Sequence, residues 1–296
     1  MPDLVRATPL ASQLVIVLVQ TSHPANIGSV ARAMKTMGVR RLHLVAPLDF
    51  PSVRAQWLAA GAEDVLTNAQ VFTTLPEAIA TAQLVIGTSA RQRQLSWPHL
   101  SVTNTAQMIL AHLLGITATD PLSSSYDQDV APQLVDNAIP LGLQAATGCE
   151  VALVFGRESS GLTNDELRLC HLHTSIDGDE AYSVLNLAQA VQIYCYELRK
   201  QWLTLSAAAP ATRAQAHLPY SLLPWDEPLA SHAAVDHCIT HLEASLQQIG
   251  FLKPHNHAKI WPRLVRLLQR QRLDGKETAL IEGLAAYLER IVYDNT

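Results

Sequence analysis

The sequence predicts an α/β protein in which a mainly parallel sheet is covered by helices and followed by a small helical domain. Strand and helix signals alternate through the first half of the 296-residue chain, an order typical of parallel sheets. Beyond residue 228 only helical patterns occur, and this change in composition indicates a second domain. We therefore expect a first domain over residues 1–205, a linker over 206–228 and a helical domain over 229–296.

The first strand and the first helix have the clearest patterns. Leu14–Val19 reads LVIVLV, and such a continuous apolar, β-branched run is typical of a strand buried on both faces. Asn26–Met37 follows with apolar residues at helical spacing, and Gly38 comes directly after its last turn.

The rest of the first domain continues the alternation. Before residue 90 we expect a strand at Leu42–Val45, a helix at Pro51–Ala60, short strands around Val65 and Val71, a helix at Pro76–Ala82 and a strand at Leu84–Ile86. The stretch 117–148 is rich in Asp, Ser, Pro and Gln and indicates a surface insertion. After it we expect a strand at Val151–Phe155, a helix capped by Thr163, a strand at His171–Ile176 and a helix at Ser183–Lys200.

The second domain has three helical patterns and no strand signal. They cover Ala230–Ile249, Ala258–Leu273 and Lys276–Val292.

The composition excludes several classes of protein. Apolar residues make up 48% of the chain, enough for a large core, yet no apolar run is long enough to span a membrane. The first ten residues lack the pattern of a secretory signal, and the four cysteines are scattered without metal-ligand spacing. We therefore expect a cytoplasmic protein with reduced thiols and no metal site. The net charge of −5 does not exclude a nucleic-acid partner, because phosphate contacts depend on local patches.

Three loop-to-helix junctions follow predicted strands and are the candidate ligand sites. They are Gln20–Arg32, Phe155–Glu166 and Asp177–Ala188. Open α/β sheets bind ligands at the carboxyl ends of their strands, and helix starts offer N–H groups to anions. None of the junctions matches the glycine pattern of dinucleotide sites or of phosphate loops, which disfavours an ordinary dinucleotide or nucleotide-triphosphate enzyme.

Each polar or glycine residue in these junctions also has a purely structural alternative. The alternatives are a helix cap for Asn26 or Asn186, a solvated surface position for Arg32, an ion pair of Glu158 with Arg157 or another cation, and turns for Gly156 and Gly161.

Taken together, the motifs resemble a known family. They are NIGSVARAMKTMG at Asn26–Gly38, TSARQRQLSWP at Thr88–Pro98, VALVFGRESSGLTNDEL at Val151–Leu167 and YSVLNLAQAVQIYCYE at Tyr182–Glu197. The chain resembles the SpoU/TrmH family of RNA 2′-O-methyltransferases in the SPOUT superfamily, and it is most similar to the TrmJ type. The likeness covers residues 13–202 apart from the insertion, and the helical tail around Arg270–Asp274 is also similar to that subgroup.

The resemblance implies a fold and an activity that periodicity does not give. It implies a trefoil knot in the C-terminal part of the sheet and a homodimer with active sites at the subunit interface. It also implies transfer of a methyl group from S-adenosylmethionine to a ribose 2′-hydroxyl of tRNA, at nucleotide 32 of the anticodon loop, on cytidine or uridine. The alternatives are another tRNA or rRNA position, and a non-catalytic RNA-binding member of the fold.

The same resemblance assigns roles to individual residues. The catalytic group comprises Arg32, which would support the emerging alkoxide, with Asn26, Glu158 and Asn186. The cofactor group comprises Thr88, Ser89, Ala90, Gly156, Ile176, Ser183, Val184 and Leu185. One departure is Val184, because many relatives have serine at this position before the Leu-Asn pair.

Two sets of cations are candidates for contact with tRNA. Arg91, Arg93 and Arg157 would lie at the strand-end edge. Lys259, Arg263, Arg266 and Arg270 are spaced by four, three and four residues and share one helical face. The alternative for this second set is a solvated face of a helical hairpin.

Overall fold

The structure is a computed structural model that describes residues 8–89, 99–114, 150–179, 184–207 and 229–294, without the side chains of 99, 270–271 and 291–294. Several predictions lie outside the described residues: the insertion at 117–148, nearly all of the linker at 206–228, and the roles of Ala90, Arg91, Arg93 and Ser183. The side chain of Arg270 lies outside them too.

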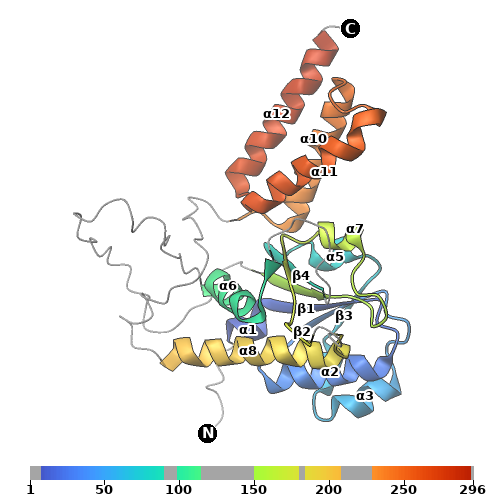
Figure 1. The fold of residues 1–296 in the computed structure, drawn as a ribbon, viewed down its shortest axis with the longest axis vertical. Coiled ribbons are helices and arrows are strands. Elements are labelled where there is room, and N and C mark those ends of the chain that lie inside the picture. Colours follow the sequence, from blue (N-terminus) through green and yellow to red (C-terminus); the bar gives the residue numbers. More distant parts are fainter. Residues whose placement is uncertain (1–7, 90–98, 115–149, 180–183, 208–228, 295–296) are drawn as a thin grey trace, which may run out of the picture.

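The predicted parallel sheet is confirmed. Within the described residues the sheet has seven strands in the order β3-β2-β1-β6-β4-β7-β5, and each neighbouring pair is parallel. Figure 1 labels β1 to β4. Because β6 lies between β1 and β4, the carboxyl ends of three strands from distant parts of the chain meet at one edge. The strands are β1 (Leu14–Val19), β2 (Arg41–Val45), β3 (Gln70–Phe72), β4 (Leu84–Thr88), β5 (His99–Leu100), β6 (Val151–Phe155) and β7 (Leu172–Thr174).

Helices cover both faces of the sheet, as the apolar run of β1 predicts. Leu14, Ile16 and Leu18 belong to one core cluster, whereas the alternate Val15, Val17 and Val19 belong to another. The first cluster is closed by α1 (Pro9–Ser12), α2 (Pro24–Thr36), α3 (Val53–Ala59), α4 (Glu63–Thr67), α6 (Val102–Leu114) and α8 (Leu187–Ala207). The second is closed by α5 (Leu75–Ile79) and α7 (Asn164–Arg168).

Gly28 allows α2 to pack closely on α3. A Cβ atom at this position would lie 2.1 Å from the carbonyl oxygen of Ala55 on α3, a distance too short for two non-bonded atoms. The glycine of the NIGSVAR motif therefore has a packing role and sets the position of α2 beside the sheet.

Several element predictions were wrong in detail. Val65 lies in α4 and not in a strand, because Ala62, Val65 and Leu66 are buried at helical spacing. The structure also has α6 and β5, which we did not predict. Helix α8 begins four residues later than expected, at Leu187, and continues to Ala207.

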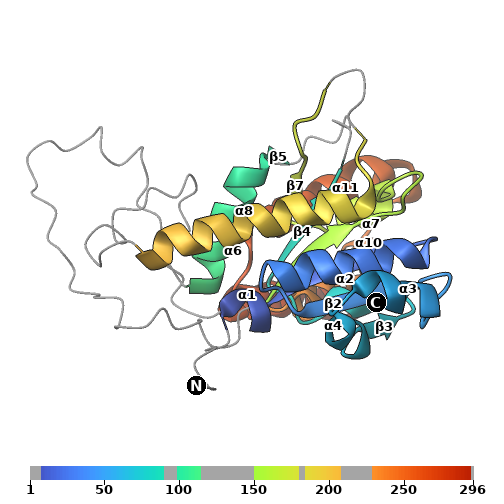
Figure 2. The same cartoon turned by 90° about the horizontal axis from the view of Figure 1, so that it is seen from below.

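The three predicted C-terminal helices are confirmed as α10 (His232–Gln248), α11 (Pro254–Gln271) and α12 (Gly275–Asp294). They lie on the side of the sheet that α5 and α7 cover, opposite α2 and α8 (Figure 1 and Figure 2), and have their own core around Trp261. Helix α10 begins against the end of α5, where the His232 amide donates to the Ala82 carbonyl oxygen at 2.9 Å. At the same junction, Arg272 donates to His112 Nδ1 of α6 at 2.6 Å. The exact domain boundaries stay a prediction.

Within the described ranges, no helix is both long and apolar enough to cross a membrane.

Candidate active site

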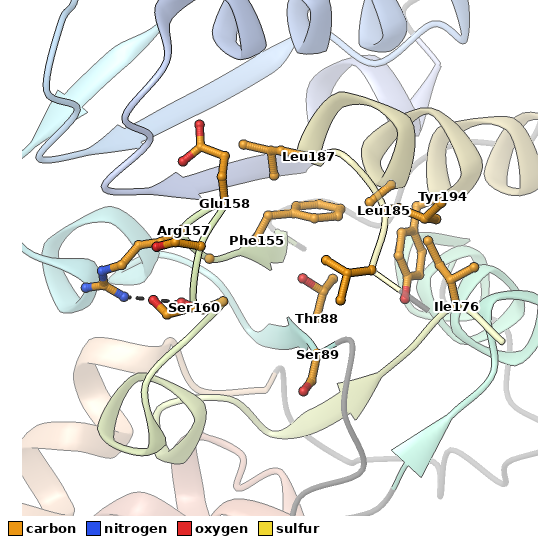
Figure 3. Close-up of a pocket in the computed structure, with 15 residues that line it drawn as sticks. Thr88, Ser89, Phe155, Arg157, Glu158, Ser160, Ile176, Leu185, Leu187 and Tyr194 are labelled. Carbon is orange, nitrogen blue, oxygen red and sulfur yellow. Dashed lines mark hydrogen bonds between the residues drawn. The ribbon is translucent and has the colours of Figure 1, made fainter. Parts of the chain in front are cut away.

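A cavity of about 300 Å³ lies at the carboxyl ends of β4 and β6 (Figure 3). Six of the eight residues predicted to hold a cofactor line it, namely Thr88, Ser89, Gly156, Ile176, Val184 and Leu185. The other two lie outside the described residues. Phe155, Leu187, Ala190 and Tyr194 also line the cavity, although the sequence did not single them out. The structure therefore brings the second and third junctions together around one pocket.

Gly156 lets the loop after β6 turn sharply at the wall of this cavity. A Cβ atom here would lie 2.1 Å from the backbone of Gly161, because the chain folds back on itself. Arg157 and Gly161 exchange two backbone hydrogen bonds across this turn, and Gly161 has a φ of +69°. Both glycines therefore make a turn, as their structural alternative states, and this turn forms one wall of the cavity.

Glu158 joins the second junction to the first. Its Oε2 accepts hydrogen bonds from the amide and the hydroxyl of Ser22, both at 3.1 Å. Its Oε1 accepts from Asn26 Nδ2 at 2.9 Å and from the His23 amide at 3.3 Å. Burial alone would raise the pKa of Glu158, but the hydrogen bonds from Asn26, Ser22 and His23 bring it below its ordinary value. The carboxylate is therefore ionised and holds the start of α2.

Asn186 joins the third junction to the same group. Its Nδ2 donates to Asn26 Oδ1 at 3.1 Å, and its own Oδ1 accepts from the Ala188 amide at 2.9 Å in the first turn of α8. The structural alternative is thus correct for Asn186, which caps α8, but the residue also contacts Asn26. For Asn26 the cap alternative is wrong, because His23 is the N-cap of α2 and the amide of Asn26 binds Glu158 and Asn186.

The structural alternative for Glu158, an ion pair with Arg157, is wrong. Arg157 donates through Nη1 and Nη2 to the two carboxylate oxygens of Glu166, at 2.9 and 2.8 Å, and through Nε to Gln20 Oε1 at 2.8 Å. The hydrogen bonds to Glu166 raise the pKa of Arg157. Thr163 caps α7 as predicted, through a hydrogen bond from the Glu166 amide at 3.2 Å. Contact of Arg157 with RNA stays a prediction, and it would compete with these protein partners.

Arg32 is exposed on α2 and is not among the residues that line the cavity. The structure therefore keeps open its structural alternative as a surface arginine. On α11, Lys259 and Arg263 are exposed and Arg266 is half-buried, while Ile260, Leu264 and Leu268 pack against the core of the helical domain. Both interpretations of the basic face, contact with tRNA and a solvated helical face, therefore stay predictions.

His171 and His173, which lie two positions apart in the sequence, have protein partners. His171 Nδ1 accepts from the Val85 amide at 2.9 Å, and His173 Nε2 donates to the Leu167 carbonyl oxygen at 3.0 Å. In the part of the chain that the structure describes, no cluster of three or more metal-ligating side chains is found.

Comparison with known families matches nearly the whole chain. Residues 13–196 match the SpoU rRNA Methylase family, and residues 233–296 match the C-terminal domain of the tRNA methyltransferase TrmJ. The first match covers all the described strands of the sheet and the three junctions, and the second covers nearly all of the three C-terminal helices.

Individual relatives agree with these matches. The chain is 40% identical over 275 residues to the tRNA (cytidine/uridine-2′-O-)-methyltransferase TrmJ of Klebsiella pneumoniae, covering 93% of this chain and 96% of the relative. Among solved structures, TrmJ from Z. mobilis has a TM-score of 0.68 at 27% identity, covering 93% of this chain and 98% of that one. A probable methylase family protein from Haemophilus influenzae has a TM-score of 0.52 at 31% identity, covering 96% and 98%. The chain therefore belongs to the SpoU methylase family.

Proposed function

We propose that this chain transfers a methyl group from S-adenosylmethionine to a ribose 2′-hydroxyl of tRNA, at nucleotide 32 of the anticodon loop. The observation that carries the proposal is the contact series from Glu158 through Asn26 to Asn186 beside the cavity. The Klebsiella pneumoniae relative, named tRNA (cytidine/uridine-2′-O-)-methyltransferase TrmJ, supports the substrate class.

The cavity fits an adenosine-bearing methyl donor. Phe155, Ile176 and Leu185 line it with apolar surface that suits the faces of a purine. Thr88 and Ser89 also line it, and the Thr88 hydroxyl, which donates to the Val154 carbonyl oxygen at 2.9 Å, can still accept a hydrogen bond. Because Gly156 has no Cβ atom, the turn packs closely on Gly161, and a ligand in the cavity could contact the backbone at Gly156. When bound, S-adenosylmethionine supplies an activated methyl group and a neutral thioether leaving group.

The difficult part of this reaction lies at the nucleophile, because a ribose hydroxyl must lose its proton as it attacks. Asn26 is well placed to orient that hydroxyl. One hydrogen of its Nδ2 is bound by Glu158, and within the described part of the chain the second hydrogen is left for an incoming oxygen. Glu158 and Asn186 fix this amide from opposite sides, so the alignment exists before the substrate binds.

Arg32 would support the alkoxide through its permanent positive charge. It is exposed and does not line the cavity of its own chain, so this role requires the homodimer that the family resemblance implies, with an active site completed at the subunit interface. We include in the proposal the trefoil knot that the family resemblance implies. The α/β sheet, with the third junction in contact with the first and lining one cavity with the second, is compatible with such a knot.

The basic face of α11 would contact the tRNA backbone. Lys259 and Arg263 are exposed there, and cations on one helical face match the spacing of phosphates better than scattered charges. Arg157, which lines the cavity, would add a contact there, and Arg91 and Arg93 stay candidates outside the described residues.

The proposed function is tested by incubating the protein with labelled S-adenosylmethionine and unmodified tRNA, and then mapping the labelled nucleotide. Label on the 2′-oxygen of nucleotide 32 is the expected result. Label at another tRNA position, or only in rRNA, would replace the assigned target, and binding without transfer would identify a non-catalytic RNA-binding protein.

A pair of arginine variants tests the role of Arg32 in the same assay. Arg32→Ala should abolish transfer and keep cofactor binding, whereas Arg54→Ala, an exposed arginine on the neighbouring α3, should remain active. An active Arg32→Ala variant would remove this residue from the catalytic group.

A further inference from the structure

Behind the cavity wall, three buried hydroxyl groups form a continuous chain. The phenolic oxygen of Tyr194 on α8 lies 3.0 Å from Thr174 Oγ1 of β7. Thr174 Oγ1 in turn lies 2.7 Å from Thr105 Oγ1 of α6. Tyr194 is 2% exposed, and both threonines are 0% exposed. Polar groups buried this deeply are stable only when they are hydrogen-bonded, so the chain fixes the relative positions of three elements.

The hydrogens of this chain have a defined direction at its Tyr194 end. Thr174 Oγ1 lies 3.0 Å from the Leu100 carbonyl oxygen, and a carbonyl can only accept. Thr105 Oγ1 donates its own hydrogen to the Ser101 carbonyl oxygen at 2.8 Å, so the single hydrogen of Thr174 goes to Leu100 or to Thr105 Oγ1. In either case Tyr194 donates its phenolic hydrogen to Thr174. The raised pKa of Tyr194, caused by burial, keeps this hydrogen in place.

Thr174 connects two walls of the cavity without lining it. Its hydroxyl holds Tyr194, whose ring lines the pocket and packs edge-on against Phe155 with ring centroids 5.7 Å apart. Its backbone carbonyl accepts from the Ser89 amide at 2.9 Å, and Ser89 lines the cavity from the end of β4. Figure 3 shows Tyr194 and Ser89 approaching the pocket from different elements.

We propose that Thr174 is a positioning residue for the methyl donor, and that its hydroxyl pre-shapes the wall formed by Tyr194 and Phe155. This inference rests on the proposed function, since it takes the cavity as the donor site. Thr174 contacts neither reacting group, so it affects the bound donor equally in the ground state and the transition state. Its loss should therefore raise the KM for the donor and leave kcat and the KM for tRNA unchanged.

A threonine can also be buried in a sheet simply because its hydroxyl is satisfied there. Three variants separate this reading from the proposal. Thr174→Val keeps the volume and removes the hydroxyl, whereas Thr174→Ser restores the hydroxyl. Ile109→Val shortens a fully buried residue of α6 and serves as a matched control that destabilises the same region without touching the hydroxyl chain.

The first measurement is calorimetric titration with S-adenosylhomocysteine, which requires no turnover. For Thr174→Val we expect a Kd about fivefold to tenfold above wild type, the range for one buried hydrogen bond. Thr174→Ser and Ile109→Val should stay close to wild type. The donor KM in the methyl-transfer assay should follow the same order at constant kcat.

A double-substitution cycle provides the second measurement. Tyr194→Phe removes the donor hydrogen and keeps the ring, so it should raise the Kd on its own. Added to Thr174→Val, it should cost nothing more, because the contact is already lost. The cycle keeps the proposal testable if one single variant unfolds, since Tyr194→Phe and Thr174→Ser then carry the comparison.

Three outcomes would overturn the proposal. They are an unchanged Kd in both Thr174→Val and Tyr194→Phe, an equal loss in Thr174→Ser and Thr174→Val, and an equal loss in the Ile109→Val control. Each differs from failure of the proposed function, in which the wild-type protein itself would not bind S-adenosylhomocysteine.

Discussion

Asn186 donates its side-chain amide to Asn26 Oδ1 at 3.1 Å, although 160 positions separate the two residues in the chain. The contact closes the third junction onto the first, and Glu158 of the second junction binds the other end of the Asn26 amide. Three turns that are far apart in sequence thus meet in one group beside the cavity.

Asn186 has two roles, and one substitution separates them. Asn186→Asp keeps an oxygen for the Ala188 amide, so α8 stays capped and the free energy of unfolding should change little. Its second carboxylate oxygen would face Asn26 Oδ1, so the contact becomes repulsive and Asn26 moves. We expect a fall in kcat of about a hundredfold, as for misplaced catalytic groups. Methyl-transfer kinetics and urea unfolding give the two readouts.

The matched variant for Asn186 is alanine, which loses the cap and the contact together. Asn186→Ala should be as inactive as Asn186→Asp but less stable by about 1 kcal/mol. Full activity in Asn186→Asp would show that only the cap matters.

We expect that an amide cannot replace the Glu158 carboxylate without loss of activity. Glu158→Gln would place an NH2 group against donors that now approach two carboxylate oxygens, those of Ser22, His23 and Asn26. We expect kcat to fall by about a hundredfold because Asn26 loses its partner. Asp165→Asn, on an exposed side chain of α7, is the control and should be fully active. Equal kcat values in the two variants would remove Glu158 from the catalytic group.

The pH dependence of Glu158 follows from its lowered pKa. Its stabilising hydrogen bonds are fully present above its ordinary pKa of 4.5, and they are lost only as the pH falls through the lower value of the folded state. An acid limb in the activity profile that lies above pH 4.5 must therefore come from another group.

Sequence patterns were sufficient for most of the sheet, without β5, and for the positions of the three junctions. Leu14–Val19 is a continuous apolar, β-branched run, and parallel strands place their carboxyl ends at one edge whatever their order in the chain. The roles of Asn26, Glu158 and Asn186 came from the family resemblance. The structure adds that their side chains contact one another.

Other parts of the site could not be predicted from patterns. Phe155 and Tyr194 have the spacing of core residues. Only the tertiary structure, in which Phe155 of β6 packs against Tyr194 of α8, places both rings at the cavity. Arg157 and Glu158 are neighbours in sequence, yet Arg157 pairs with Glu166 because the turn at Gly161 brings α7 back beside it. Such pairings depend on tertiary geometry that local sequence does not encode.

Gly156 should be essential for binding the donor. In Gly156→Ala the new Cβ atom would overlap the backbone of Gly161 and Leu162, so the turn at the cavity wall must move. We expect loss of S-adenosylhomocysteine binding in calorimetric titration, with the helical domain intact by circular dichroism. Gly283→Ala is the matched control, because a Cβ atom there meets nothing within 4 Å. That variant should bind normally and gain up to about 1 kcal/mol of stability from helix propensity.

The basic face of α11 should act through phosphate contacts. Replacing Lys259 and Arg263 together by alanine should weaken tRNA binding, and it should reduce the slope of log affinity against log salt by up to about 2. The kcat at saturating tRNA should be unchanged, since neither residue lies at the cavity. Arg40→Ala, which removes an exposed partner of Asp64, is the control. An unchanged salt slope in the double variant would favour a merely solvated face.

His171 should make the folded protein lose stability in acid. Burial, and secondly the charges of His232, Arg272 and His112, lower the pKa of His171 to about 3. The unfolded chain takes up a proton near its ordinary pKa of 6.5, whereas the folded chain does not, so the free energy of unfolding falls as the pH drops from 6.5 toward 3. At about pH 5 the loss from this residue should be about 2 kcal/mol.

A substitution that keeps the hydrogen bond isolates this effect. His171→Asn retains an acceptor for the Val85 amide and cannot titrate. Urea unfolding at about pH 7 and about pH 5 should show a smaller loss in this variant than in wild type. His241 acts in the opposite direction, because its hydrogen bond to Glu282 raises its pKa and stabilises the helical domain at low pH. His241→Gln should therefore steepen the acid loss, and parallel pH profiles for wild type and His171→Asn would show that His171 is not the group that titrates.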